Sequence, residues 1–154
     1  MDSLLILDLD GTLVLRQNKR IIKRKGLSEF LLEVLSLYKV GIFTSMLTRN
    51  MTLTLRDIMT PDQINDLEFV WDREYTSKDP DGPYEWSTIK TLESLELLPN
   101  LYKNVLIVDD DPRKLRQIPD ENKLECPSFK DENEEEEVLK ELLILIKRRL
   151  NSSF

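Results

Sequence analysis

Short apolar runs recur along the chain and indicate buried strands. They span residues 4–7, 40–43, 67–71 and 105–108, and aspartates follow the first and the last of them. A run of this length without polar alternation is typical of a parallel strand that is covered on both faces of its sheet. The pattern therefore predicts strands at these four places.

Between these runs, apolar side chains recur at the three- and four-residue spacing of helices. Gly26 or Ser28 is expected near the start of the first helix, and Thr60-Pro61 is expected to end the second. The stripes cover residues 27–38, 51–59 and 89–98, the last one formed by Ile89, Leu92, Leu95 and Leu98.

The segment 134–149 predicts a further helix. Four successive glutamates would occupy its first turn and three cations its last, which complements the helix dipole. Its apolar face is expected to consist of Val138, Leu142, Leu145 and Ile146.

The alternation of strands and helices indicates an α/β fold with right-handed crossovers. We expect a three-layer Rossmann-like parallel sheet in a single domain over residues 1–154, because the chain shows no repeat and no flexible linker. In such folds ligands bind beyond the carboxyl ends of the strands. The aspartates that follow the first and last runs would therefore meet at this edge.

Composition narrows the chemistry that this edge can support. The 154 residues include no histidine, which excludes Ser-His-Asp and Cys-His catalysis and His-ligated zinc. The four glycines lack the spacing of a Rossmann fingerprint or a P-loop, and the net charge of -7 argues against general polyanion binding. Carboxylates must therefore carry any acid–base or metal chemistry.

The first apolar run is too short for a signal peptide or a membrane span. With Cys126 as the only cysteine, we expect a soluble protein of a reducing intracellular compartment, nuclear or cytoplasmic, without a membrane partner. A reactive or dimer-forming Cys126 is the alternative, and the sequence leaves the oligomeric state open.

Aspartates at two strand ends form the main candidate site. Asp8 and Asp10 are two residues apart, so in an extended chain their carboxylates point the same way. Gly11 turns the chain and lets backbone amides approach a phosphate. Asp109 and Asp110 add the hard oxygens that Mg²⁺ prefers. Each motif alone is an ordinary turn, but their combination indicates a metal-dependent phosphate site.

Two further features fit such a site. Thr44 and Ser45 follow the second apolar run and offer hydroxyls and amides to phosphoryl oxygens, although such residues are more often helix caps. Lys90 could offset the negative charge, although a single lysine is usually solvated.

At residues 8–14, Asp-Leu-Asp-Gly-Thr-Leu-Val, the sequence resembles the first motif of the haloacid dehalogenase superfamily of aspartyl-phosphate phosphotransferases. Within it, the chain is most similar to the phosphatases of the RNA polymerase II C-terminal domain and of the nuclear-LIM-interactor (NLI) interacting-factor group. The supporting stretches are residues 23–31, 41–45 and 108–112. The resemblance runs from residue 4 to about residue 149 and implies a haloacid dehalogenase-like fold with a minimal cap or insert.

The resemblance implies a role for each residue of the first two motifs. Asp8 would be the nucleophile that forms an aspartyl-phosphate, and Asp10 would be the acid–base partner. Thr44 would bind the transferring phosphoryl group, with Ser45 and Gly11 beside it.

The metal that the resemblance implies is Mg²⁺, held by Asp8, Asp10, Asp109 and Asp110, with Asp10 contributing its backbone carbonyl. Asp110 aligns with the ligand of the fourth motif. Asp109 aligns with its neighbour, which orients the lysine or a metal-bound water. The sequence does not separate these last two roles.

The active-site lysine has two candidates, Lys78 and Lys90. We favour Lys90, because leucines follow it at positions 92 and 95 as they do in the family. Arg73 stands where relatives have an arginine near the substrate, and a surface ion pair is the alternative for it.

Some features of the sequence depart from the family or are not explained by the resemblance. Gly11 stands where close relatives carry a bulkier residue. The stretch from Thr44 to Lys90 leaves no room for a large cap, and an open site favours a macromolecular phosphoester. Residues 16–25 are basic and either guide an acidic substrate or form a solvated hairpin. The acidic run 131–137 is either solvated or in contact with those bases or a partner.

These observations predict a Mg²⁺-dependent phosphomonoester phosphatase that acts through an aspartyl-phosphate. By resemblance, the substrate would be phosphoserine or phosphothreonine in a protein, with the RNA polymerase II tail as one candidate. The alternatives are a nucleic-acid-end (3′-phosphate) phosphatase and a catalytically silent binding module of the same fold.

Overall fold

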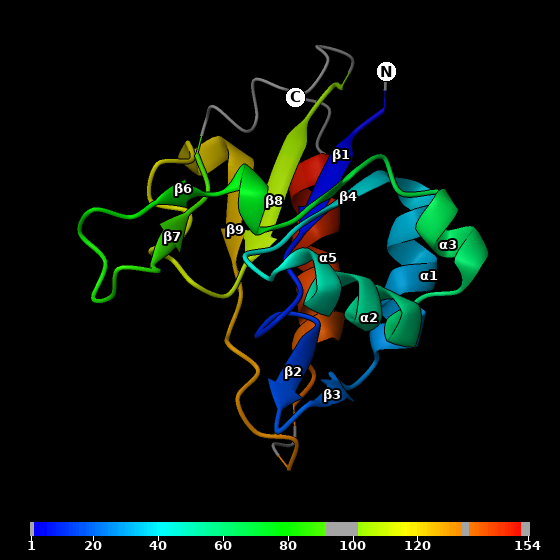
Figure 1. The fold of residues 1–154 in the computed structure, drawn as a ribbon. Helices are drawn as coiled ribbons and strands as arrows, with labels where there is room; N and C mark the ends of the chain where they lie inside the picture. The colour runs from blue at the N-terminus through cyan, green and yellow to red at the C-terminus, as the bar shows by residue number, and fades with distance from the viewer. Residues whose placement is uncertain (1, 92–101, 134–135, 152–154) are drawn as a thin grey trace.

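A five-stranded, all-parallel sheet forms the centre of the computed structural model, which describes residues 2–91, 102–133 and 136–151 (Figure 1). Its strand order is β5-β4-β1-β8-β9. The predicted parallel α/β sheet is therefore confirmed. The strands are β1 (Leu4–Leu7), β4 (Lys39–Phe43), β5 (Val70–Trp71), β8 (Val105–Asp109) and β9 (Lys123–Glu125).

One strand is shorter than predicted, and another was not predicted. The apolar run 67–71 contributes only Val70–Trp71 to the sheet. The short edge strand β9 follows the 3₁₀ turn η2 (Asp120–Asn122) and was not predicted, because its three residues, two half-buried and one exposed, form no apolar run.

The position of β1 at the centre of the sheet explains why its sequence is apolar throughout. Successive side chains point to opposite faces, so Leu5 and Leu7 pack on the helical side while Leu4 and Ile6 pack on the other. All four are fully buried. Burial of such side chains contributes about 1.5–3 kcal/mol each.

Helices α1 (Leu27–Leu37), α2 (Thr48–Ile58) and α5 (Val138–Leu150) contribute buried residues to the core cluster on the Leu5 side of the sheet. Gly26, in the left-handed region at φ +81°, is the N-cap of α1, so the start lies at Gly26 and not at Ser28. None of the described helices is long and apolar enough to cross a membrane.

The second helix ends as predicted, but Thr60-Pro61 also begins another. The Thr60 hydroxyl accepts the N–H of Gln63, and the Gln63 side chain accepts the N–H of Thr60. This capping box, with Pro61 at the first helical position, starts the short helix α3 (Pro61–Asn65).

The predicted C-terminal helix starts later than its sequence pattern indicated. The helix begins at Val138. Glu136 and Glu137 stand before it and form ion pairs, so they do not belong to its first turn. Leu145 is 40% exposed and does not belong to the buried face. That face consists of Leu139, Leu142, Ile146 and Leu150.

The predicted helical stripe at 89–98 needs a correction at its start. Ile89 lies in strand β7 (Thr88–Ile89), which pairs antiparallel with β6 (Ser77–Lys78) after the 3₁₀ turn η1 (Arg73–Tyr75). This hairpin is the small insert that the sequence allowed. Leu92, Leu95 and Leu98 lie outside the described residues.

The basic stretch forms the antiparallel hairpin of β2 (Val14–Gln17) and β3 (Arg20–Lys23), and the acidic run contacts it. Arg20 pairs with Glu132 at 3.5 Å and Lys25 with Glu137 at 2.8 Å, both at the surface. The stretch is therefore partly neutralised within the molecule.

Arg24 is the buried centre of this contact. Its side chain donates to both carboxylate oxygens of Glu136, at 2.5 and 2.9 Å, and to the carbonyl of Thr12 at 3.0 Å. The guanidinium also lies 5.4 Å from the ring centroid of Phe129. Arg24 thus connects the turn after β1 to the segment before α5.

The single thiol is buried behind the same turn. Cys126 is 3% exposed, and burial raises the pKa of its thiol to about 12. A neutral, covered thiol does not fit the reactive or dimer-forming alternative.

We predict that Arg24→Met lowers the free energy of unfolding by about 3–5 kcal/mol, because it leaves the Glu136 carboxylate without its buried partner. Urea denaturation measures the change. Lys25→Met is the matched control, since its pair with Glu137 is exposed and should contribute little to stability. Equal losses in the two variants would contradict the role given to Arg24.

Candidate active site

Three strand ends bring the predicted residues to one edge of the sheet. Asp8 follows β1, Thr44 follows β4, and Asp109 ends β8. Because β1 lies between β4 and β8 in the sheet, the three ends are neighbours. They open into a cleft of about 500 Å³, which Asp10, Ser45 and Asp110 also line. The cleft therefore lies at the edge of the sheet where the sequence analysis expected a site.

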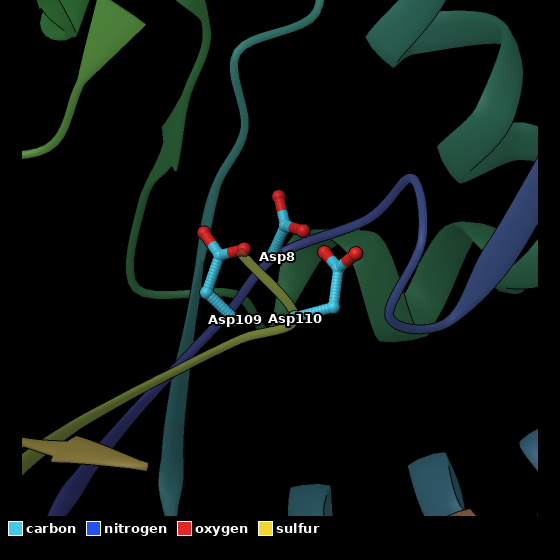
Figure 2. Close-up of side chains that lie close together, drawn as sticks. All are labelled: Asp8, Asp109 and Asp110. Carbon is cyan, nitrogen blue, oxygen red and sulfur yellow. The ribbon is translucent and has the colours of Figure 1, made fainter. Parts of the chain in front are cut away.

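The carboxylates of Asp8, Asp109 and Asp110 converge in this cleft (Figure 2). One oxygen from each lies within 4.8 Å of the others. Asp109 is fully buried, Asp8 is 5% exposed, and Asp110 is half-buried. Oxygen atoms at this spacing can surround one small hard cation such as Mg²⁺.

Lys90 lies beneath these carboxylates and is fully buried. Its ammonium donates to Asp109 Oδ2 at 2.6 Å, to the carbonyl of Phe43 at 2.7 Å and to Asp8 Oδ1 at 3.3 Å. Lys78, the other candidate, is exposed on β6. The structure therefore brings Lys90, and not Lys78, to the aspartates.

The pKa directions follow from this burial. Burial raises the pKa of Asp8 well above its ordinary value, and the charge of Asp109 adds to the shift. Burial would also raise the pKa of Asp109, but the Lys90 ammonium outweighs it and lowers that pKa. For Lys90, burial alone would lower the pKa, but Asp109 and Asp8 raise it. Lys90 and Asp109 thus form a stable ion pair, and Asp8 bears the unbalanced charge.

Two hydroxyls that the sequence analysis did not assign complete the carboxylate cluster. Thr12 Oγ1 lies 3.0 Å from Asp8 Oδ2 and 3.2 Å from Asp110 Oδ1, so its one proton can be donated to either. Ser128 donates to Asp110 Oδ2 at 2.8 Å. Thr12 lies in the first motif, whereas Ser128 comes from a loop beyond β9 and has no sequence signal.

Gly11 has a steric role in the turn after β1. Its φ is +87°, and a side-chain Cβ at this position would lie 2.8 Å from the carboxyl carbon of Asp110. Its N–H donates to the carbonyl of Val14 at 2.8 Å, within the turn. A glycine is therefore needed here for the close packing of the turn against Asp110, and the expected contact of this turn with phosphate stays a prediction.

Asp10 lines the same cleft as Asp8 but stands apart from the three converged carboxylates. Its side chain is exposed and accepts the N–H of Arg16 at 3.0 Å. This bond fixes the carboxylate at the entrance to the cleft.

The hydroxyl pair after β4 also lines the cleft. Thr44 is buried, and its Oγ1 accepts the N–H of Met46 at 3.1 Å. Ser45 Oγ accepts a hydrogen bond from the ammonium of Lys114. Neither caps α2, whose N-cap is Leu47.

The rim of the cleft is formed by the insert. Arg73 lines the cleft and donates to the carbonyl of Trp86 at 2.5 Å. The rings of Tyr84 and Trp86 stack with centroids 4.7 Å apart, and they are 58% and 64% exposed. Neither aromatic residue was singled out in the sequence, because an isolated Tyr or Trp in a turn has no distinctive pattern.

A family model for NLI interacting factor-like phosphatases matches residues 3–153. The chain belongs to this family.

Solved structures agree on the fold. The fission yeast RNA polymerase II CTD phosphatase Fcp1, in a variant bound to beryllium fluoride, is 16% identical with a TM-score of 0.58, over 96% of this chain and 50% of that one. A second structure of Fcp1, described as an essential RNA polymerase II CTD phosphatase, is also 16% identical with a TM-score of 0.59, over 96% and 48%. The chain spans about half the length of these proteins. No curated protein matches the sequence.

Because the pKa of Asp8 is raised on folding, its ionisation opposes folding once the pH exceeds the ordinary carboxylate value near 4. We predict that Asp8→Asn increases the free energy of unfolding at pH 7.5 in EDTA, because the amide replaces a carboxylate whose charge is disfavoured mainly by burial and also by Asp109. Urea denaturation at pH 5 and pH 7.5 tests this. A less stable variant at pH 7.5 would contradict the charge balance described above.

Proposed function

We propose that the chain is a Mg²⁺-dependent phosphomonoester phosphatase that acts through an aspartyl-phosphate on Asp8. The observation that carries this proposal is the convergence of Asp8, Asp109 and Asp110 over the buried Lys90, at the carboxyl edge of a parallel sheet. Family membership supports the same reaction class.

In the first step, an oxygen of Asp8 bonds to phosphorus and the bond to the leaving oxygen breaks, while Asp10 gives that oxygen its proton. In the second step, Asp10 takes a proton from water, which bonds to phosphorus and releases Asp8 and phosphate. The fixed position of Asp10 at the cleft entrance supports this assignment. Thr44 and Ser45 lie where they can donate to the phosphoryl oxygens.

The donor set fits Mg²⁺, which takes oxygen ligands and keeps several waters. Asp8, Asp110 and the carbonyl of Asp10 are the ligands that we propose. Asp109 is the most deeply buried of the three carboxylates and accepts the Lys90 ammonium at 2.6 Å, so we assign it the role of orienting the lysine. When bound, the cation neutralises charge on the phosphoryl group.

For the substrate, we propose a phosphorylated protein. The similar structures are those of RNA polymerase II CTD phosphatases, which makes that tail one candidate. The small insert leaves the cleft open, and the stacked Tyr84 and Trp86 on its rim offer apolar surface to a chain that extends from the phosphate. Exposed aromatic surface of this kind marks binding sites.

A nucleic-acid-end phosphatase is the second candidate, and the same aromatic pair favours it, because bases stack on exposed rings. The basic hairpin supports it less than its composition indicated, since Arg20, Arg24 and Lys25 are paired with glutamates. The intact set of Asp8, Asp10 and Thr44 argues against a silent binding module.

The deciding experiment measures phosphate release from a doubly phosphorylated RNA polymerase II tail-repeat peptide and from a 3′-phosphorylated oligonucleotide, each with Mg²⁺ or with EDTA. Mg²⁺-dependent release from the peptide alone supports the proposal, and release from the oligonucleotide alone favours the second candidate. Asp8→Asn is the control, and full activity in this variant would exclude the aspartyl-phosphate.

We expect Asp10→Asn to lower kcat by about 10²–10⁴-fold, the usual effect of losing a general acid–base group. The side chain is exposed, so the fold should be retained, which circular dichroism checks. Steady-state rates with a small phosphoester measure the loss. A change under about threefold would mean that Asp10 is not the proton donor.

We expect Trp86→Ala to raise KM for the phosphopeptide about tenfold, equivalent to about 1.4 kcal/mol of binding. The side chain is 64% exposed and lies on the rim, so kcat/KM for p-nitrophenyl phosphate should not change. Parallel steady-state assays with both substrates make the comparison. An equal loss on both substrates would place Trp86 in the chemistry instead of in peptide binding.

A further inference from the structure

The loop of the insert that carries the rim aromatics buries no apolar side chain. It projects from the body of the molecule between β6 and β7 (Figure 1). Residues 80–87 are all exposed or half-buried, and Asp79, at 4% exposed, is the single buried residue between the two strands. Hydrophobic burial therefore does not hold this loop, and its position on the rim depends on polar contacts.

Asp79 makes these contacts through Arg116. The Arg116 guanidinium donates to both carboxylate oxygens of Asp79, at 2.5 and 2.9 Å, in a bidentate ion pair. Arg113 adds a longer contact, 3.6 Å from Asp79, and donates to the carbonyl of Asp81 at 3.0 Å. A bidentate pair fixes direction as well as distance, so it holds the loop in one orientation against the turn that follows β8.

The turn that carries Arg116 is a rigid base. Leu115 and Ile118, on either side of Arg116, are 1% and 2% exposed and pack in the core cluster that contains Leu4. The turn directly follows Asp109, so it is joined to the end of β8 that carries the site carboxylates. The ion pair therefore sets the position of the loop relative to those carboxylates.

Hydrogen bonds within the loop connect the stacked rings to the ion pair. The N–H of Asp79 donates to the carbonyl of Ser87 at 2.9 Å. Ser87 in turn donates its N–H to the carbonyl of Tyr84 at 3.1 Å, and its hydroxyl accepts the N–H of Tyr84 at 3.2 Å. Trp86 stacks on Tyr84. A displacement of Asp79 would therefore displace both rings.

We propose that Asp79 and Arg116 are positioning residues for a macromolecular substrate. Their ion pair holds the stacked Tyr84 and Trp86 where a peptide chain that extends from the phosphate can bind them. This rests on the proposed phosphatase function. Arg116 does not line the cleft, and Asp79 does not belong to the carboxylate cluster. The pair therefore acts on peptide binding and leaves the chemistry of a small phosphoester unchanged.

The test measures binding of the doubly phosphorylated peptide by fluorescence anisotropy in an Asp8→Asn background, and kcat/KM for p-nitrophenyl phosphate in the active protein. Arg116→Met should weaken peptide binding roughly tenfold, the loss expected for Trp86→Ala, and leave kcat/KM for the small substrate unchanged. Arg116→Lys keeps the charge without the bidentate geometry and should recover part of the affinity. Arg148→Met, at an exposed position of α5, is the matched control and should change neither.

Two measurements separate this role from a general loss of stability. Hydrogen exchange over residues 79–88 should be about tenfold faster in Arg116→Met and unchanged in β1 and β8. Arg116→Met combined with Trp86→Ala should weaken peptide binding by much less than the product of the single effects, because the pair acts through the rings. If Arg116→Met fails to fold, Asp79→Asn replaces it, since it removes the same pair and keeps the side-chain volume.

Peptide affinity within about twofold of the parent protein, or unchanged exchange in the loop, overturns the inference whether or not the protein is a phosphatase. An equal loss on p-nitrophenyl phosphate also overturns it, because the pair would then act on the chemistry. Protein that binds the peptide through the ion pair but releases phosphate from no phosphoester supports the inference and refutes the proposed function.

Discussion

The rest of the site depends on the burial of one ammonium group among carboxylates. Lys90 has no exposed surface, and an unpaired charge at that depth would cost several kcal/mol. The ion pair with Asp109 removes this cost, and it does so only if β8, the end of β4 and the insert hairpin meet at one point. The electrostatics of the site are therefore also a constraint on the fold.

The same constraint explains why Asp8 differs from Asp109. The Lys90 ammonium compensates Asp109 and lowers its pKa, whereas burial raises the pKa of Asp8 well above its ordinary value. Asp110 accepts hydrogen bonds from two hydroxyls, and burial raises its pKa as well. The two carboxylates beside the ion pair therefore carry the negative charge that a bound cation relieves.

Local patterns predicted the parallel sheet and the strand-end aspartates, because each is encoded by residues close together in sequence, whereas the choice of Lys90 came from the resemblance to the family. The predictions that were wrong depended on distant partners. The glutamates before α5 were predicted to form the first turn of the helix, but two of them form ion pairs with Arg24 and Lys25. Ile89 has the spacing of a helical stripe, but in the structure it pairs with Ser77 in a β-hairpin. Ser128 and Lys114 reach the site from loops, where no periodicity identifies a residue.

The contact between Arg24 and Glu136 joins residues 112 positions apart, and Thr12 reaches Asp110 across 98. During synthesis, Asp8 and its turn leave the ribosome before the groups that hold them in place. Contacts of such long sequence separation form slowly, because the loop between them must close first. Asp8 is thus made before the groups that hold it, so a partly synthesised chain carries the residues of the first motif without the assembled carboxylate cluster.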